Sequence, residues 1–191
     1  MDLKILDYPI ICVMGKLGSG KTLTTTFIAY IFEKYCLEKG LDLTIFSNYE
    51  LDLSLYKRVK AVDIMKLPKD LKDGIMILDE MHSEGGDSYN FLSPVAKKIT
   101  TFVTQIRKRN IALIYTTQDY GFIMSRLRRL TYYFIQITPL KDYKTRITIR
   151  QKDGYMIINE FEIDLTDMFD YYDTNEFISQ EDIETLELVE E

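Results

Sequence analysis

The stretch YPIICVMGKLGSGKT, residues 8–22, joins a continuous apolar run to a glycine-rich loop. The loop itself, GKLGSGKT at residues 15–22, satisfies the phosphate-cradling pattern G-x-x-x-x-G-K-[ST]. An apolar run directly before it is typical of a parallel strand that is buried on both faces. The pattern of residues 21–39, ended by Gly40, predicts a helix directly after it. This order of strand, loop and helix predicts a site for the phosphates of a nucleotide.

The residues of this loop have separate expected roles. Backbone amides would face the phosphates, assisted by the positive end of the following helix. We expect Lys21 to reach the β- and γ-phosphates and the Thr22 hydroxyl to hold Mg²⁺. ATP and Mg²⁺ are the expected cofactors, and the predicted nucleotide-binding set is Gly15, Lys16, Leu17, Gly18, Ser19, Gly20, Lys21 and Thr22.

Two adjacent carboxylates end the apolar run GIMILDE, residues 74–80, which predicts another buried strand. Asp79 is placed where P-loop ATPases have the carboxylate that orients magnesium. A kinase must exclude water, whereas an ATPase gains from a base that orients and deprotonates it, an effect worth about 10²- to 10⁴-fold. Glu80 is the candidate for that base, and the alternative is a solvated loop carboxylate.

The run IALIYTTQ, residues 111–118, predicts the next strand and ends in an amide. Such a strand can lie between the Asp-Glu strand and the strand before the phosphate loop. Gln118 would then point toward the γ-phosphate and sense hydrolysis. The alternative is that Gln118 only caps the strand end.

Arginines cluster around this strand. Arg107 and Arg109 precede it, and cations are favoured at a helix C-terminus by about 0.3 to 1 kcal/mol, which explains such a pair without a catalytic role. The stretch SRLRRL, residues 125–130, adds three more, and we expect all five at the carboxyl edge of the sheet. This number exceeds what helix capping needs. The arginines are therefore candidates for completing a neighbour's active site, an effect worth about 10³- to 10⁵-fold, or for contacting DNA phosphates.

The remaining patterns complete an α/β fold. Residues 50–73 suggest short helices, and HSEGGDSYN, residues 82–90, suggests a mobile loop. Asp153-Gly154 between two alternating runs predicts a β-hairpin. The fold class is therefore a three-layer αβα P-loop NTPase of the RecA or ASCE type, with a mainly parallel sheet and a C-terminal antiparallel hairpin. The other expected elements are strands at 43–48 and 131–137 and helices at 94–110 and 122–129.

The net charge of −6 hides an uneven distribution. Residues 160–191 hold 13 Asp or Glu and no Lys or Arg, which leaves 24 basic and 17 acidic residues in 1–159, a net of +7. We expect an ATPase domain at 1–165 and an acidic tail at 166–191, which either keeps the protein soluble or competes with nucleic acid for the basic body. No run approaches the ~18 consecutive apolar residues of a membrane span. The expected location is the host-cell cytoplasm, with association to a virion as a further possibility.

The motifs GKLGSGKT, MILDE and QIRKRNIALIYTTQ together resemble the FtsK/HerA superfamily of DNA-pumping ATPases. Within it, the chain length and the SNYEL segment look most like zonula occludens toxin-like ATPases and compact viral genome-packaging ATPases. The resemblance covers roughly residues 8–138. It implies the same roles for Lys21, Thr22, Asp79, Glu80 and Gln118, and it places Arg107 where the family has an arginine before its sensor strand.

What the resemblance implies as partners is double-stranded DNA and further copies of the chain, in a ring of about six. Filamentous-phage members carry a transmembrane helix beyond the ATPase domain. None is seen here, so the expectation favours packaging of a viral genome into a capsid, mostly through non-specific phosphate contacts. One alternative is extrusion of virions or transfer of DNA through a membrane partner. The other is a nucleotide-dependent switch that moves no DNA.

Overall fold

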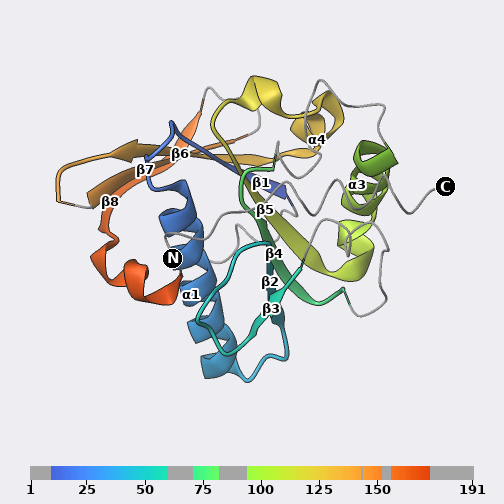
Figure 1. The fold of residues 1–191 in the computed structure, drawn as a ribbon, viewed down its shortest axis with the longest axis horizontal. Coiled ribbons are helices and arrows are strands. Elements are labelled where there is room, and N and C mark those ends of the chain that lie inside the picture. The colour runs from blue at the N-terminus through green and yellow to red at the C-terminus, as the bar shows by residue number, and fades with distance from the viewer. Residues whose placement is uncertain (1–9, 60–70, 82–93, 143, 152–155, 173–191) are drawn as a thin grey trace.

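The structure, a computed structural model, describes residues 10–59, 71–81, 94–142, 144–151 and 156–172. Within these ranges eight strands form one sheet (Figure 1). The strands are β1 (Ile10–Met14), β2 (Thr44–Ser47), β3 (Tyr56–Arg58), β4 (Gly74–Leu78), β5 (Ile111–Thr117), β6 (Tyr133–Pro139), β7 (Lys144–Gln151) and β8 (Ile157–Asp164). The helices are α1 (Lys21–Lys39), α3 (Pro94–Gln105) and α4 (Ser125–Leu130), with 3-10 turns η3 (Ile106–Arg109), η4 (Tyr120–Phe122) and η5 (Thr166–Tyr171).

The strand order β3-β2-β4-β5-β1-β6-β7-β8 combines a parallel and an antiparallel part. Strands β3 to β6 in that order pair in parallel, whereas β7 pairs antiparallel with both β6 and β8. This confirms the predicted fold class, including the C-terminal hairpin. Because the parallel strands end at one edge, the segments that follow β1, β4 and β5 meet there.

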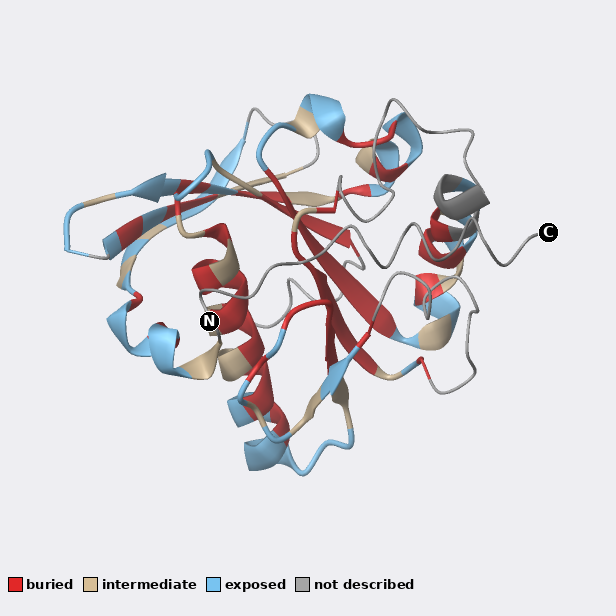
Figure 2. Cartoon of the chain, in the orientation of Figure 1, coloured by how far each residue is buried: buried red, intermediate tan, exposed pale blue. Residues whose placement is uncertain are grey.

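Helices cover both faces of the parallel part (Figure 1). Side chains of β5 alternate between them: Ala112 and Ile114 join the apolar cluster under α1, whereas Leu113 and Tyr115 join the cluster under α3 and α4. All seven residues of β5 are buried, and Figure 2 shows the same for the neighbouring central strands. A continuous apolar run is what a strand with two covered faces requires. The three-layer prediction is thus confirmed.

The helix α1 begins and ends where the sequence predicts, at Lys21 and at Lys39, before Gly40 in a left-handed conformation. Its buried threonines have hydrogen-bond partners: Thr24 Oγ1 donates to Gly20 O at 2.8 Å, and Thr25 Oγ1 donates to Thr22 O at 2.9 Å. Buried hydroxyls without partners would cost about 1 to 3 kcal/mol each. The polar first half of α1 is therefore compatible with a buried position.

Two segments differ from their predictions. Residues 50–73 were expected to form short helices, but Tyr56–Arg58 forms edge strand β3, parallel to β2, because Ile45 and Ser47 of β2 pair with it. The helix predicted at 94–110 is α-helical only to Gln105 and continues as the 3-10 turn η3. Strand β8 pairs with β7 in the predicted hairpin, with a register shift between Ile149 and Arg150. The predicted loop at 82–90 and the Asp-Gly turn itself lie outside the described residues.

The segment after β8 packs on α1. Leu165 and Met168 are buried against Leu23, and the rings of Tyr30 and Tyr171 lie 4.9 Å apart. The Asp52 amide also donates to Tyr171 O at 2.9 Å. The packed part of the chain therefore extends past residue 165, where the sequence suggested that the domain ends. In the ranges described, no helix has the length and apolar character needed to cross a bilayer.

Candidate functional site

The phosphate loop connects β1 to α1 at the carboxyl edge of the sheet. Gly18 and Gly20 have φ angles of 70° and 87°, a region that other residues rarely adopt, which explains the two glycines. Ser19 is 3% exposed, and its Oγ has no hydrogen-bond partner among the described residues. The Lys21 ammonium donates to Lys16 O at 3.2 Å. A buried hydroxyl without a partner beside an ammonium is a setting that fits a phosphate group.

Asp79 follows β4 and is only 5% exposed. Its carboxylate accepts hydrogen bonds from Thr22 Oγ1, at 2.6 Å, and from Thr116 Oγ1 of β5. Asn48, after β2, holds the Asp79 backbone from the other side: Nδ2 donates to the carbonyl at 3.0 Å, and Oδ1 accepts from the amide at 2.8 Å. Thr22 of α1 and Thr116 of β5 thus fix the carboxylate of Asp79, and Asn48 after β2 fixes its backbone.

Thr22 and Asp79 provide a hydroxyl and a carboxylate at one point, and both are oxygen donors of the kind that Mg²⁺ prefers. Burial raises the pKa of Asp79, against the hydrogen bonds from Thr116 and Thr22. Burial lowers the pKa of Lys21, which Asp79 and Glu80 oppose. A divalent cation would favour the ionised form of Asp79, so the residues present fit magnesium with Thr22 and Asp79 as the groups that would hold it.

Glu80 has an unusual backbone conformation, with φ of 48°. Its amide donates to Thr116 Oγ1 at 2.8 Å, and the next amide, of Met81, donates to Thr116 O at 3.1 Å. Left-handed conformations of residues other than glycine cost on the order of 1 to 3 kcal/mol and cluster at functional sites. The strand β5 therefore holds the Asp79–Met81 turn in the shape that presents the Glu80 side chain.

Gln118 follows β5, which lies between β4 and β1 as the sequence predicted. Its Nε2 donates to Glu80 Oε1 at 3.3 Å. Gln118 is exposed and Glu80 is half-buried, so both side chains are accessible to solvent. The structure thus brings together the two groups that the sequence proposed as water base and sensor.

A cavity of about 590 Å³ opens over the loop. Its floor includes the phosphate loop, Asp79 and Glu80. The walls come from two segments that sequence analysis did not assign to the site: the β6–β7 connection and η5 with the residue after it. The wall residues are Pro139, Leu140, Asp142, Lys144, Thr145, Phe169 and Tyr172.

Tyr172 is a wall residue whose pKa is raised by burial and raised further by the charge of Asp79. Its ring also meets Tyr49 edge-on, with centroids 6.3 Å apart. The acidic C-terminal segment therefore supplies an aromatic side to the nucleotide cavity.

Arg107 and Arg109 lie at the opposite edge of the sheet, which corrects the expectation that all five arginines share the carboxyl edge. Arg109 comes just before the first residue of β5, and its Nη1 donates to Leu71 O at 3.1 Å, ahead of β4. The seven-residue β5 separates them from Gln118 by roughly 20 Å. Neither arginine is among the residues that line the nucleotide cavity of its own chain. A catalytic role for them would therefore have to be exerted on a neighbouring chain, and the alternative is the structural role at the helix end. Arg107 is exposed and thus accessible to such a partner.

The sequence patterns did not indicate the residues that hold Asp79 or those that form the cavity walls. Asn48 and Thr116 hold Asp79, and Phe169 lines the cavity. The signal for Thr116 was its place two residues before Gln118 on a strand already identified. Asn48 likewise follows β2 directly. Polar residues at the carboxyl ends of all three strands could have been grouped together; Phe169 has no comparable signal.

Comparison with known proteins identifies related sequences. The model of the ATPase family associated with various cellular activities (AAA) matches residues 11–138. An uncharacterized protein of Spiroplasma virus SpV1-R8A2 B is 27% identical over 175 residues, which cover 83% of this chain and 49% of that protein. One of Spiroplasma virus SpV1-C74 is 29% identical over 134 residues, which cover 66% and 37%. The chain spans about half the length, or less, of these relatives.

Solved structures share the fold. The N-terminal domain of zonular occludens toxin from Neisseria meningitidis has a TM-score of 0.65 at 19% identity, covering 87% of this chain and 100% of that domain. The genome packaging NTPase of Sulfolobus turreted icosahedral virus 2, in complex with AMPPCP, has a TM-score of 0.55 at 11% identity, covering 80% and 96%. At these identities the likeness concerns the fold.

Proposed function

The chain belongs to the AAA family of P-loop ATPases, and from this premise we propose that it is a Mg²⁺-dependent ATPase whose turnover moves duplex DNA. The observation that carries the proposal is the contact between Glu80 and Gln118, at 3.3 Å, beside the buried Asp79. A kinase site has no use for a water-activating carboxylate at this position. A carboxylate joined to a strand-end amide suits hydrolysis with a reporter of the γ-phosphate.

In the proposed reaction each residue has one task. The phosphate loop and Lys21 bind the phosphates, and Thr22 and Asp79 would hold Mg²⁺, which supplies charge stabilisation when bound. Glu80 orients a water molecule and takes its proton, and Gln118 positions Glu80 until the γ-phosphate has left. The Glu80 amide is hydrogen-bonded to Thr116, so a change at Glu80 during hydrolysis can be passed to β5 and to the segments that follow it.

Support for DNA as the moved polymer comes from charge and from relatives. Residues 1–159 carry a net charge of +7, which favours contact with a polyanion. A similar fold is found in a protein described as the DNA-packaging ATPase of Sulfolobus turreted icosahedral virus, with a TM-score of 0.53. The proposal includes assembly into a ring, in which the exposed Arg107 would face a neighbouring chain.

Two settings suit such a motor, namely packaging into a capsid and export through a membrane partner. The sequence-based preference for packaging depended on the lack of a transmembrane helix. Since the chain spans about half of its curated relatives, that lack does not decide between them. The likeness to the whole N-terminal domain of zonular occludens toxin favours keeping export as the second candidate. Affinity purification from infected cells distinguishes them, because export predicts recovery of a membrane protein and packaging predicts capsid protein.

The test of the proposal is translocation itself. A labelled third strand annealed to a duplex is displaced by a protein that moves along that duplex. We expect displacement with ATP and Mg²⁺, and none with the variant Lys21→Ala or with a non-hydrolysable ATP analogue. ATP hydrolysis without displacement would leave an ATPase that is not a motor. Slow hydrolysis that ignores DNA would favour the nucleotide-dependent switch.

A further inference from the structure

A second cavity is lined by residues of α3, by residues of α4 and by the residue before α4. Both helices lie on the face of the sheet opposite α1 (Figure 1). The volume of the cavity is about 650 Å³. We propose that it binds a backbone phosphate of duplex DNA and is a point where the moved polymer is held. The inference rests on the proposed function, since it gives the residues by which the motor grips its polymer. The described residues that line it are Lys97, Thr100, Thr101, Met124, Ser125, Arg126 and Arg128.

The chemistry of this lining suits a phosphodiester. It combines three cations and three hydroxyls, and none of the described lining residues is acidic. Guanidinium groups and hydroxyls are the side chains that most often contact nucleic-acid phosphates. Lys97 and Arg126 are both exposed and can adjust to a polymer that moves past them. A carboxylate of a neighbouring chain would also be attracted by the positive charge of the cavity. Such a carboxylate would not, however, need three hydroxyl groups beside the cations.

Arg128 is the one cation of the cavity that is held in place. Its guanidinium carbon lies 5.8 Å from the centre of the Tyr120 ring, and the Tyr120 hydroxyl donates to Arg128 O at 2.7 Å. Its Nε is buried and has no hydrogen-bond partner among the described residues. The Nε atom itself is buried, but Arg128 as a whole is half-buried and lines the cavity. Arg128 therefore gives the cavity a cation that is packed against the protein beside the two exposed ones.

The cavity is also close in the chain to the proposed sensor. Gln118 contacts Glu80, and two residues later Tyr120 packs edge-on against Phe134, with ring centroids 4.9 Å apart, while it holds Arg128. Asp119, between them, accepts a hydrogen bond from Gly121 N at 2.6 Å, which fixes the turn. One short, well-packed segment thus joins the γ-phosphate end of the site to the proposed DNA contact.

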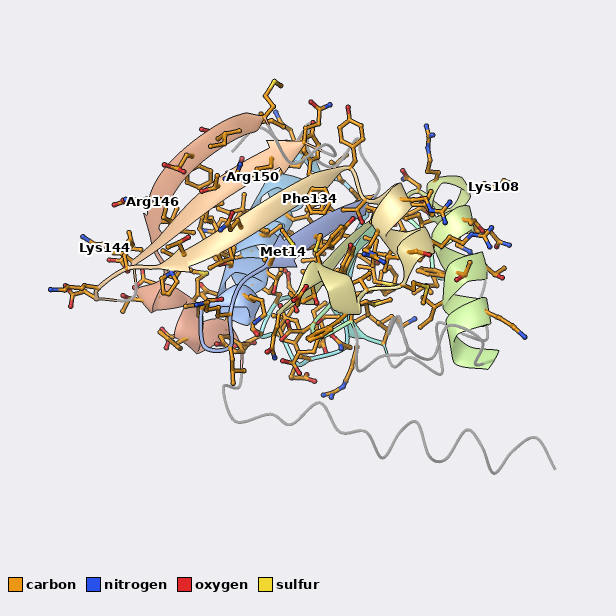
Figure 3. All side chains as sticks on the ribbon, turned by 90° about the horizontal axis from the view of Figure 1, so that it is seen from above. Met14, Lys108, Phe134, Lys144, Arg146 and Arg150 are labelled. Atoms are coloured by element: carbon orange, nitrogen blue, oxygen red, sulfur yellow. The ribbon has the colours of Figure 1, made fainter. Side chains whose placement is uncertain are left out.

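The test compares two double variants of equal charge. Lys97→Gln with Arg126→Gln removes two exposed cations of the cavity. Lys108→Gln with Arg129→Gln removes two exposed cations outside it, one on η3 and one on α4. Figure 3 shows Lys108 beside α3, away from Lys144, Arg146 and Arg150 on β7. Affinity for a labelled duplex is measured by fluorescence anisotropy at several salt concentrations, and the oligomeric state by light scattering.

We expect the cavity variant to lose roughly tenfold in duplex affinity and about one unit of the salt slope, with the control within about threefold of the original protein. Equal losses in the two variants, with the original protein binding duplex, would overturn the cavity while leaving the proposed function intact. A change of oligomeric state in the cavity variant alone would assign the cavity to a neighbouring chain and overturn the proposal. If the original protein binds no duplex at all, the proposed function fails first.

Discussion

The nucleotide edge and the α3–α4 cavity, the two proposed phosphate sites, differ in how their side chains are held. At the nucleotide edge, the buried Asp79 has partners on both oxygens and on its backbone amide and carbonyl. In the α3–α4 cavity, Lys97 and Arg126 are exposed, and Arg128 has a donor without a partner. Chemistry that repeats at each turnover needs fixed geometry, whereas a sliding polymer needs contacts that form and break. The contrast predicts that changes at the nucleotide edge act on rate and changes at the cavity act on affinity.

The substitution Glu80→Gln, at the nucleotide edge, has the largest expected effect on the rate. The variant keeps size and hydrogen bonding but cannot accept the proton of water, so we expect ATP hydrolysis to fall by about 10²- to 10⁴-fold. ATP binding, measured with a fluorescent analogue, should stay near that of the original protein. Glu38→Gln, at the exposed far end of α1, is the matched control. Near-normal turnover in Glu80→Gln would make Glu80 a solvated carboxylate.

The two regions should also differ in how strongly they depend on salt concentration. Each DNA phosphate contacted contributes a slope of about −0.9 in log affinity against log salt, so two contacts lose roughly tenfold between 50 and 200 mM. Turnover without DNA should change far less, because buried interactions are screened less than exposed ones. Anisotropy and ATPase assays in the same buffers compare the two. A duplex affinity that does not depend on salt would argue against phosphate contacts.

Phe169→Ala tests the aromatic wall contributed by the C-terminal segment. Losing this apolar side costs about 1 kcal/mol, and we expect a Kd for ATP about fivefold higher. Phe122→Ala is the control, since Phe122 is 41% exposed, against 37% for Phe169, and does not line that cavity. Calorimetry with a non-hydrolysable analogue measures both variants. Identical affinities would show that the wall does not contact the nucleotide.

The smallest expected effect is on stability. Because burial raises the pKa of Asp79, the folded protein binds this proton more tightly than the unfolded chain does. The resulting stabilisation is present below about pH 4 and is lost as pH rises through the pKa of the folded state. Asp79→Asn removes the loss, so without nucleotide and Mg²⁺ its Tm at pH 7 should exceed that of the original protein. Thermal melts from pH 4 to 8 test this, and a lower Tm at pH 7 would contradict it.

The parts of the fold that depend on local patterns were predictable. The bounds of α1 and β5 and the position of β5 beside β4 and β1 follow from apolar runs, a glycine cap and the chain order. Strand β3 was not predictable, because three residues at a sheet edge leave no period to detect. It exists through pairing with β2, which is a tertiary effect.

For the site, the sequence indicated the residues that carry charge but not those that hold them. Asn48 and Thr116 are ordinary strand-end residues until the register places them on either side of Asp79. Arg109 was misplaced because nearness in the chain to β5 says nothing about which end of β5 faces the nucleotide. Phe169 lies in an acidic segment whose composition suggests solvation, and its packing appears only in three dimensions.

We propose that hydrolysis at Glu80 is coupled to duplex DNA. Steady-state ATP turnover with and without duplex, recorded together with the oligomeric state, tests it most directly. We expect turnover that rises with added duplex and an assembly of several chains. A slow rate that duplex does not change, from a monomeric protein, would show that hydrolysis is not coupled to DNA.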